Sequence, residues 1–192
     1  MKDKYGGFWL RQNPPFVDIS YFCDTLFIRK LNAQKKRIDV MRNKYLRAIS
    51  RKNQIKIGPT NGACAIVGAS DVFTGGIDSF RLNVKTRSTK KTPVRVFEFV
   101  KDGIFTEIFS GFGKNLNRLC FTQDQIIRFV KDHAKWLRAD GFGTFFLFKE
   151  KGKFFVARVL QIESGPRVNK IHMSCDYDVY AVNRHRFVIP QL

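Results

Sequence analysis

The sequence has few cysteines, and none of them lies close to another. Cys23, Cys64, Cys120 and Cys175 are 41, 56 and 55 residues apart. Zinc knuckles and dithiol redox motifs place two ligands within a few residues of each other, so neither class of site is indicated. We therefore expect reduced thiols, which are typical of proteins in the cytosol or the nucleus.

Long hydrophobic runs are missing as well. No stretch approaches the roughly 18 consecutive apolar residues that a membrane-spanning helix requires. The N-terminal residues MKDKYGG are not followed by the apolar segment of a secretory leader. The sequence thus predicts a protein that has no membrane partner and is not secreted, with a cytoplasmic, nuclear or nucleoid-associated location.

Acidic residues are scarce. The sequence has 35 Lys and Arg against 16 Asp and Glu, which gives a net charge of +19. Hydrophobic residues make up 44% of the 192 residues, enough for a folded core. Repulsion among so many like charges opposes compaction, so an anionic partner is expected. Nucleic acid, an anionic membrane surface and an acidic protein are the partner classes that fit such a charge, and the first and the last are the partners predicted here.

Nucleotide-binding motifs are absent from the glycine-rich part of the chain, residues 58–76. In GPTNGACA an alanine follows the last glycine, where a phosphate-binding loop requires a lysine. The dinucleotide pattern G-x-G-x-x-G is absent too. The glycine-containing segments 58–62 and 74–78 are predicted to form turns on either side of a strand, and no cofactor is predicted.

The three histidines do not indicate a metal site. His172 and Cys175 would face opposite sides of a strand, because side chains alternate along it. His133 lies on the apolar stripe of a predicted helix and is expected to be a hydrogen-bonded residue in or near the core. His185 stands among polar and basic neighbours over residues 183–186, which predicts that it belongs to an exposed cationic tip.

Helical periodicity marks two segments most clearly. Apolar residues recur at spacings of three and four at Ile38, Met41, Tyr45 and Ile49. This pattern predicts a basic helix over residues 33–51, preceded by a less regular helix over 18–31 and an irregular arm over 1–15. A second amphipathic helix is predicted from Thr122, its N-cap, to Asp140.

Alternating apolar residues and turn residues predict strands over much of the remaining chain. The expected strands cover residues 63–69 and 80–85, hairpins over 93–110 and 143–162, and segments 170–175 and 177–182. Strands outnumber helices, which predicts an α+β fold with a largely antiparallel sheet, an N-terminal basic helical segment and one central amphipathic helix. The predicted parts are an arm with the basic segment (1–57) and an α+β domain (58–192); one continuous domain is the alternative.

Positive charge is concentrated in two segments. Residues 29–56 hold eleven Lys and Arg against one acid, Asp39, and the loop KTRSTKKTP over residues 85–93 is also cationic. Polyanions bind such ridges because each neutralised phosphate releases condensed counterions. The predicted nucleic-acid contacts are Lys35, Lys36, Arg37, Arg42, Lys44, Arg47, Arg51, Lys52, Arg87, Lys90 and Lys91.

The sequence therefore predicts a non-catalytic protein that binds the phosphate backbone of DNA or RNA. One alternative is a protein-interaction module, or an assembly or virion component, that binds an acidic partner surface. A second alternative is a metal-dependent nuclease, whose site would need two or three carboxylates around one metal ion. Its candidate carboxylates are Glu98 and Glu107, expected to face each other across a hairpin, and Asp102 at the tip, with Lys149 on a nearby strand.

Overall fold

The computed structural model describes residues 43–80, 86–175 and 178–191, which belong to one compact unit spanning Val40–Leu192. The strands are β1 (Leu46–Ala48), β2 (Ile55–Ile57), β3 (Gly76–Asp78), β4 (Thr92–Phe99), β5 (Gly103–Ile104), β6 (Gly143–Glu150), β7 (Lys153–Ile162), β8 (Gly165–His172), β9 (Asp178–Val179) and β10 (Arg186–Pro190). The α-helices are α2 (Phe105–Ser110) and α3 (Gln123–Asp132). Short 3₁₀ helices are η1 (Ile66–Gly68), η2 (Leu116–Leu119), η3 (Ala134–Trp136) and η4 (Ala181–Asn183).

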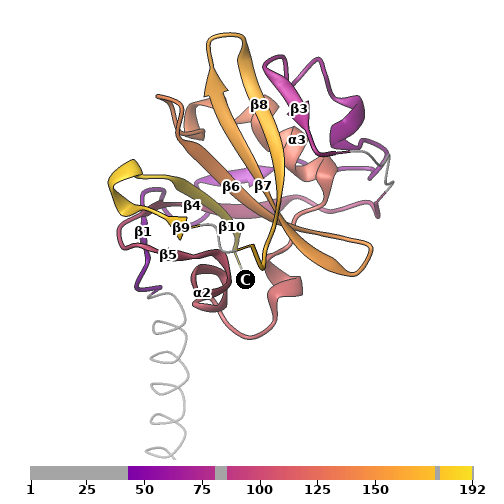
Figure 1. Cartoon of the computed structure of the whole chain (residues 1–192). Helices are drawn as coiled ribbons and strands as arrows, with labels where there is room; N and C mark the ends of the chain where they lie inside the picture. Colours follow the sequence, from indigo (N-terminus) through magenta and orange to yellow (C-terminus); the bar gives the residue numbers. More distant parts are fainter. Residues whose placement is uncertain (1–42, 81–85, 176–177, 192) are drawn as a thin grey trace, which may run out of the picture. The chain divides into compact units, whose positions relative to one another are not determined.

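Eight strands form one mixed sheet, and β10, the last strand along the chain, lies inside it (Figure 1). The strand order is β1-β4-β10-β6-β7-β8-β3, with β2 also paired to β4. The pairs β10–β6 and β3–β8 are parallel, and the other pairs of this sheet are antiparallel. β5 and β9 form a separate antiparallel pair. The predicted mixed α+β class, with mostly strands and few helices, is confirmed.

The central strand β6 is buried on both faces, which explains its continuous apolar sequence GTFFLF. Phe146 and Phe148 pack with residues of α3 on one side, which we call the α3 face. Phe145 and Leu147 pack with residues of α2 on the other side, the α2 face. The sheet therefore separates two apolar cores, and residues that alternate along one strand belong to different cores.

The amphipathic helix α3 begins where the sequence predicts. The Thr122 hydroxyl accepts a hydrogen bond from the Gln125 N–H, and the Gln125 side chain accepts one from the Thr122 N–H. This reciprocal cap satisfies two N–H groups that a helix start leaves without partners. The helix ends at Asp132, earlier than predicted, and no helix among the described residues is long and apolar enough to cross a membrane.

The predicted basic helix is wrong over its described part. Residues 43–51 form a turn followed by β1, because Leu46, Arg47 and Ala48 pair with the far end of β4. Tyr45 and Leu46, adjacent in sequence, are both buried against the α2-face core. Residues 33–42 of that helix, the helix over 18–31 and the arm over 1–15 lie outside the described residues.

Two predicted strands are helices instead. Residues 63–69 contain η1, and the expected return strand of the 93–110 hairpin is α2. Phe105, Ile108 and Phe109 are spaced as one helical face, and that face is fully buried on the α2 side of the sheet. Their burial as a helix outweighs the strand propensity of IFTEIFS.

The C-terminal strands differ from the prediction in their extent. The strand expected over residues 170–175 is the end of the longer β8. The strand expected over 177–182 is reduced to β9, after which η4 begins. The hairpin of β6 and β7 is confirmed with its turn at Lys151 and Gly152, both at positive φ. Of the strand expected over 80–85, residues 81–85 are not described.

Candidate nucleic-acid interface

Two basic segments that are far apart in the sequence, residues 44–56 and 86–91, lie along one edge of the sheet. β1 and β2 both pair with β4, so residues 46–57 line the same side of that strand. The pairing continues beyond the strands, where the N–H groups of Thr60 and Thr89 each donate to the other residue's carbonyl oxygen at 3.0 and 2.8 Å. The basic segment that precedes β2 and the cationic loop that precedes β4 therefore form one continuous edge.

The described residues among the predicted nucleic-acid contacts all lie along this edge. They are Lys44, Arg47, Arg51, Lys52, Arg87, Lys90 and Lys91, and each is exposed. Lys56 on β2 is exposed as well, although the prediction omitted it. We call these eight residues the cationic edge. The remaining predicted contacts, Lys35, Lys36, Arg37 and Arg42, lie outside the described residues.

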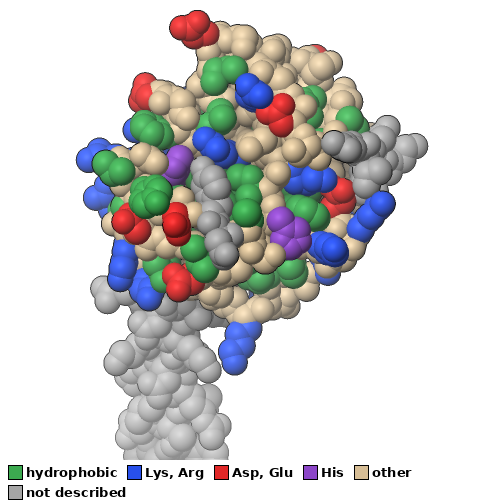
Figure 2. All heavy atoms as spheres, in the orientation of Figure 1, with side chains coloured by type: hydrophobic (Ala, Val, Ile, Leu, Met, Phe, Trp, Pro, Cys, Tyr) green, Lys and Arg blue, Asp and Glu red, His purple; other side chains and the backbone are tan. Residues whose placement is uncertain are grey.

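Few acids neutralise the cationic edge. Within residues 43–80, 86–175 and 178–191, Arg47 is the one member with an ion-pair partner, Glu98, at 2.7 Å. The ammonium of Lys44 lies 4.9 Å from the ring centroid of Tyr45, which orients it without reducing its charge. Figure 2, in the orientation of Figure 1, shows acidic and apolar side chains between the basic ones on the face that it presents.

The length of the cationic edge suits an extended polyanion. Arg47 lies opposite Glu98 and Thr60 opposite Thr89, so the edge extends for about 30 Å at roughly 3.3 Å per strand residue. One strand of DNA presents about nine phosphates over that distance, at roughly 3.4 Å each along the helix axis. The cationic edge therefore offers about as many positive charges as such a strand offers negative ones.

At the β1 end of this edge, a row of polar residues runs from the edge strand toward the centre of the sheet, perpendicular to the strands. Arg47, Glu98, Arg186 and Thr144 are successive partners on β1, β4, β10 and β6. They share the α3 face, where Glu98 lies between two arginines. Arg138, which follows η3, donates its N–H to the Thr144 hydroxyl at 2.7 Å and so lies at the same place. We call Arg47, Arg138 and Arg186 the arginine cluster.

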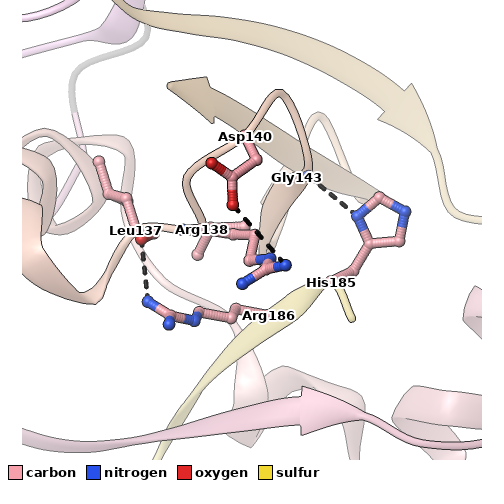
Figure 3. A network of polar contacts seen from close by, with 7 residues as sticks. Leu137, Arg138, Asp140, Gly143, His185 and Arg186 are labelled. Carbon is pink, nitrogen blue, oxygen red and sulfur yellow. Dashed lines mark hydrogen bonds and ion pairs between the residues drawn. The ribbon is translucent and has the colours of Figure 1, made fainter. Parts of the chain in front are cut away.

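The interior members of the arginine cluster have few partners (Figure 3). Nη1 of Arg186 donates to the Leu137 carbonyl oxygen at 2.9 Å. Nη2 of Arg138 lies 3.9 Å from Asp140, a carboxylate that is 73% exposed. The Nε atoms of Arg138 and Arg186 are buried and have no hydrogen-bond partner in the described part of the chain. Burial, and next the charge of Arg138, lower the pKa of Arg186, while Glu98 acts in the opposite direction.

The prediction that His185 belongs to an exposed tip is wrong. Its side chain is 3% exposed and lies 5.1 Å from the Phe145 ring, because β10 inserts between β4 and β6. The Gly143 N–H donates to its Nδ1 at 2.9 Å (Figure 3). Burial, followed by the charges of Arg158 and Arg138, lowers the pKa of His185 to about 4. His185 is therefore neutral at physiological pH and contributes no positive charge to the surface.

Replacement of His185 with asparagine is expected to flatten the pH dependence of stability between pH 6.5 and 4. The unfolded chain binds a proton at the ordinary histidine pKa of 6.5, but the folded protein binds it near 4. The folded state thus loses stability as pH falls through this window, by about 2 kcal/mol after allowance for solvent screening. Urea unfolding of wild type and His185→Asn at pH 7 and pH 4.5 measures the difference, and parallel pH profiles would contradict it.

The carboxylates considered for a nuclease do not form a common site. Glu98 binds Arg47, Glu107 on α2 accepts a hydrogen bond from the Tyr45 hydroxyl at 2.6 Å, and Asp102 accepts one from the Ala181 N–H at 2.6 Å. The expected opposition of Glu98 and Glu107 is wrong, because α2 replaces the return strand. Among the described residues, no three His, Cys, Asp or Glu side chains gather closely enough to hold a metal ion.

The other residues considered for chemistry are engaged in local contacts. Lys149 donates to the Asn117 side-chain oxygen at 3.0 Å, and the His172 ring lies 2.6 Å from the Ser174 hydroxyl. Nε2 of His133 lies 3.2 Å from the Lys56 carbonyl oxygen and its ring contacts Phe129, as expected for a residue at the border of the core. A scan against family models, a search of curated proteins and a search of solved structures each return no match for this chain.

Proposed function

We propose that the protein binds nucleic acid through contacts between the cationic edge and the phosphate backbone, without catalysing a reaction on it. The observation that carries this proposal is the row of exposed Lys and Arg along β1, β2 and the segment before β4, with one ion pair among them in the described residues. Each cation that neutralises a phosphate releases condensed counterions, and a cation without an acidic partner does so without losing an existing ion pair. Phosphate contacts fix the position of the protein on the nucleic acid but do not distinguish one base from another. Affinity is therefore expected to depend weakly on the base sequence.

Affinity for an oligonucleotide is expected to fall steeply with salt. With about seven phosphate contacts, log Kd should change with log salt by a slope of magnitude about 6 on duplex DNA and about 5 on a single strand. Between 50 and 200 mM salt this corresponds to a loss of about 10³ in affinity. Fluorescence anisotropy with labelled duplex and single-stranded DNA and RNA measures the slopes and shows which polymer is preferred.

A polyanionic peptide separates this proposal from binding to an acidic protein. Polyglutamate of matched length carries similar charge but lacks the spacing of phosphates, so we expect it to bind at least tenfold more weakly than the oligonucleotide. Tighter binding to polyglutamate, together with pull-down partners that survive nuclease treatment, would favour an acidic protein partner instead. A slope with a magnitude below about 2 would rule out the cationic edge as a phosphate-binding surface.

A further inference from the structure

The arginine cluster holds like charges together in a partly buried place. Arg186 lies between Glu98 and Thr144 in the register of the sheet, and Arg138 donates its N–H to the Thr144 hydroxyl at 2.7 Å. The charge of Arg138 therefore lies near that of Arg186 and lowers the pKa of Arg186. An arginine does not give up its proton, so the repulsion between the two guanidinium groups persists in the free protein. In the lower dielectric of a partly buried site such repulsion is stronger than it would be in water.

The acids nearby do not balance these charges. Glu98, whose side chain is 13% exposed, already forms an ion pair with Arg47 at 2.7 Å. Asp140 lies 3.9 Å from Arg138, and solvent screens a carboxylate that is 73% exposed. Among the described residues, Glu98 and Asp140 are thus the carboxylates that act on these three guanidinium groups, and an added anion would relieve the excess of positive charge.

The cluster is accessible to an anion from solvent. The side chain of Arg138 is 22% exposed to solvent and that of Arg47 is 67% exposed. Planar guanidinium groups donate paired hydrogen bonds that match the oxygens of a phosphate. Arg47 belongs to both the cluster and the cationic edge, so a phosphate held here would lie at the β1 end of a chain of phosphates along that edge.

We propose that Arg138 and Arg186, with Arg47 beside them, form a binding site for a single phosphate group of the nucleic-acid backbone. The assignment of the phosphate to a nucleic acid rests on the proposed function, whereas the site itself rests on the charges and exposure of the cluster. The site differs from the rest of the cationic edge, because its two inner arginines are partly buried and fixed by the fold. It anchors the polyanion at one end, while the exposed lysines and arginines neutralise the remainder.

The test uses inorganic phosphate and a labelled oligonucleotide on the full chain. In NMR titrations, phosphate is expected to shift the guanidinium N–H signals of Arg138 and Arg186 more than those of other arginines. Arg138→Gln and Arg186→Gln are each expected to lower phosphate affinity at least tenfold and oligonucleotide affinity about tenfold, and to reduce the salt slope by about one. The matched control is Arg167→Gln on β8, an exposed arginine with its own ion pair to Asp78, which should change neither affinity.

The outcomes separate this inference from the proposed function. Phosphate affinity that is unchanged in both variants overturns the site, even where the oligonucleotide still binds through the cationic edge. Phosphate binding that is lost in the variants while oligonucleotide binding persists unchanged overturns the backbone assignment and identifies a site for a small free phosphate. If Arg186→Gln does not fold, Arg138→Lys and Arg186→Lys retain the charge but lose the paired donors, and they should still lower phosphate affinity.

Discussion

Glutamate at Arg51, Lys90 and Lys91 together is expected to lower the affinity for an oligonucleotide at least 100-fold. All three side chains are exposed members of the cationic edge, and no ion pair joins any of them to another described residue. Each phosphate contact contributes a factor of about 10 at 0.1 M salt through counterion release, so the loss of three contacts removes about 10³. The new carboxylates add repulsion against the phosphates. Anisotropy at 0.1 M salt measures the loss.

The matched control reverses the same number of charges outside the cationic edge. Lys114, Lys151 and Lys153 are exposed, and their replacement with glutamate changes the net charge equally. Exposed substitutions of this kind leave the free energy of unfolding within about 0.5 kcal/mol, so both triple variants should fold. We expect the control to lose less than tenfold in affinity. Equal losses in the two variants would show that overall charge, and not the cationic edge, controls binding.

Local signals in the sequence predict the elements that depend on local interactions. The hairpin of β6 and β7 follows from alternating apolar residues around a turn at Lys151 and Gly152. The start of α3 follows from the reciprocal hydrogen bonds of Thr122 and Gln125. In both cases the residues that decide the structure lie within a few positions of each other, so their pattern is visible in the sequence.

Elements that depend on distant partners were predicted less well. Tyr45 and Ile49 have a helical spacing, yet residues 46–48 form a strand because β4, about fifty residues later, offers a pairing edge. The polar neighbours of His185 suggest exposure, yet β10 carries the residue between two other strands. The arginine cluster was missed for the same reason, since the register of four strands places Arg47 and Arg186 on one face and a hydrogen bond to Thr144 adds Arg138.

The described cationic residues are nevertheless exposed as the sequence suggests, because charge that is concentrated in sequence stays on the surface in either secondary structure. A strand exposes Arg47 as a helix would, and the turn before β2 exposes Arg51 and Lys52. The change from helix to strand alters the geometry of the surface. It arranges the cations along one sheet edge, where the second basic segment joins them through β4.

Replacement of Phe187 with alanine is expected to lower the free energy of unfolding by about 4 kcal/mol. The side chain is fully buried at the centre of the α2-face core, and its ring centroid lies 4.9 Å from that of Phe145 and 5.7 Å from that of Phe109. β10 joins β4 to β6, so a cavity at this position affects both halves of the sheet. For a chain of this size, the melting temperature should fall by roughly 8–16 °C.

The same substitution also tests whether the two faces of β10 act separately. Phe187 points to the α2 face, whereas its neighbour Arg186 lies on the α3 face with Thr144 and Glu98. Folded molecules of Phe187→Ala should therefore keep their oligonucleotide affinity within about twofold at a temperature well below melting. Val182→Ala is the control, because that side chain is 85% exposed and should change stability by less than about 0.5 kcal/mol. A loss below about 1 kcal/mol in Phe187→Ala would contradict the central position of β10, on which the geometry of the arginine cluster depends.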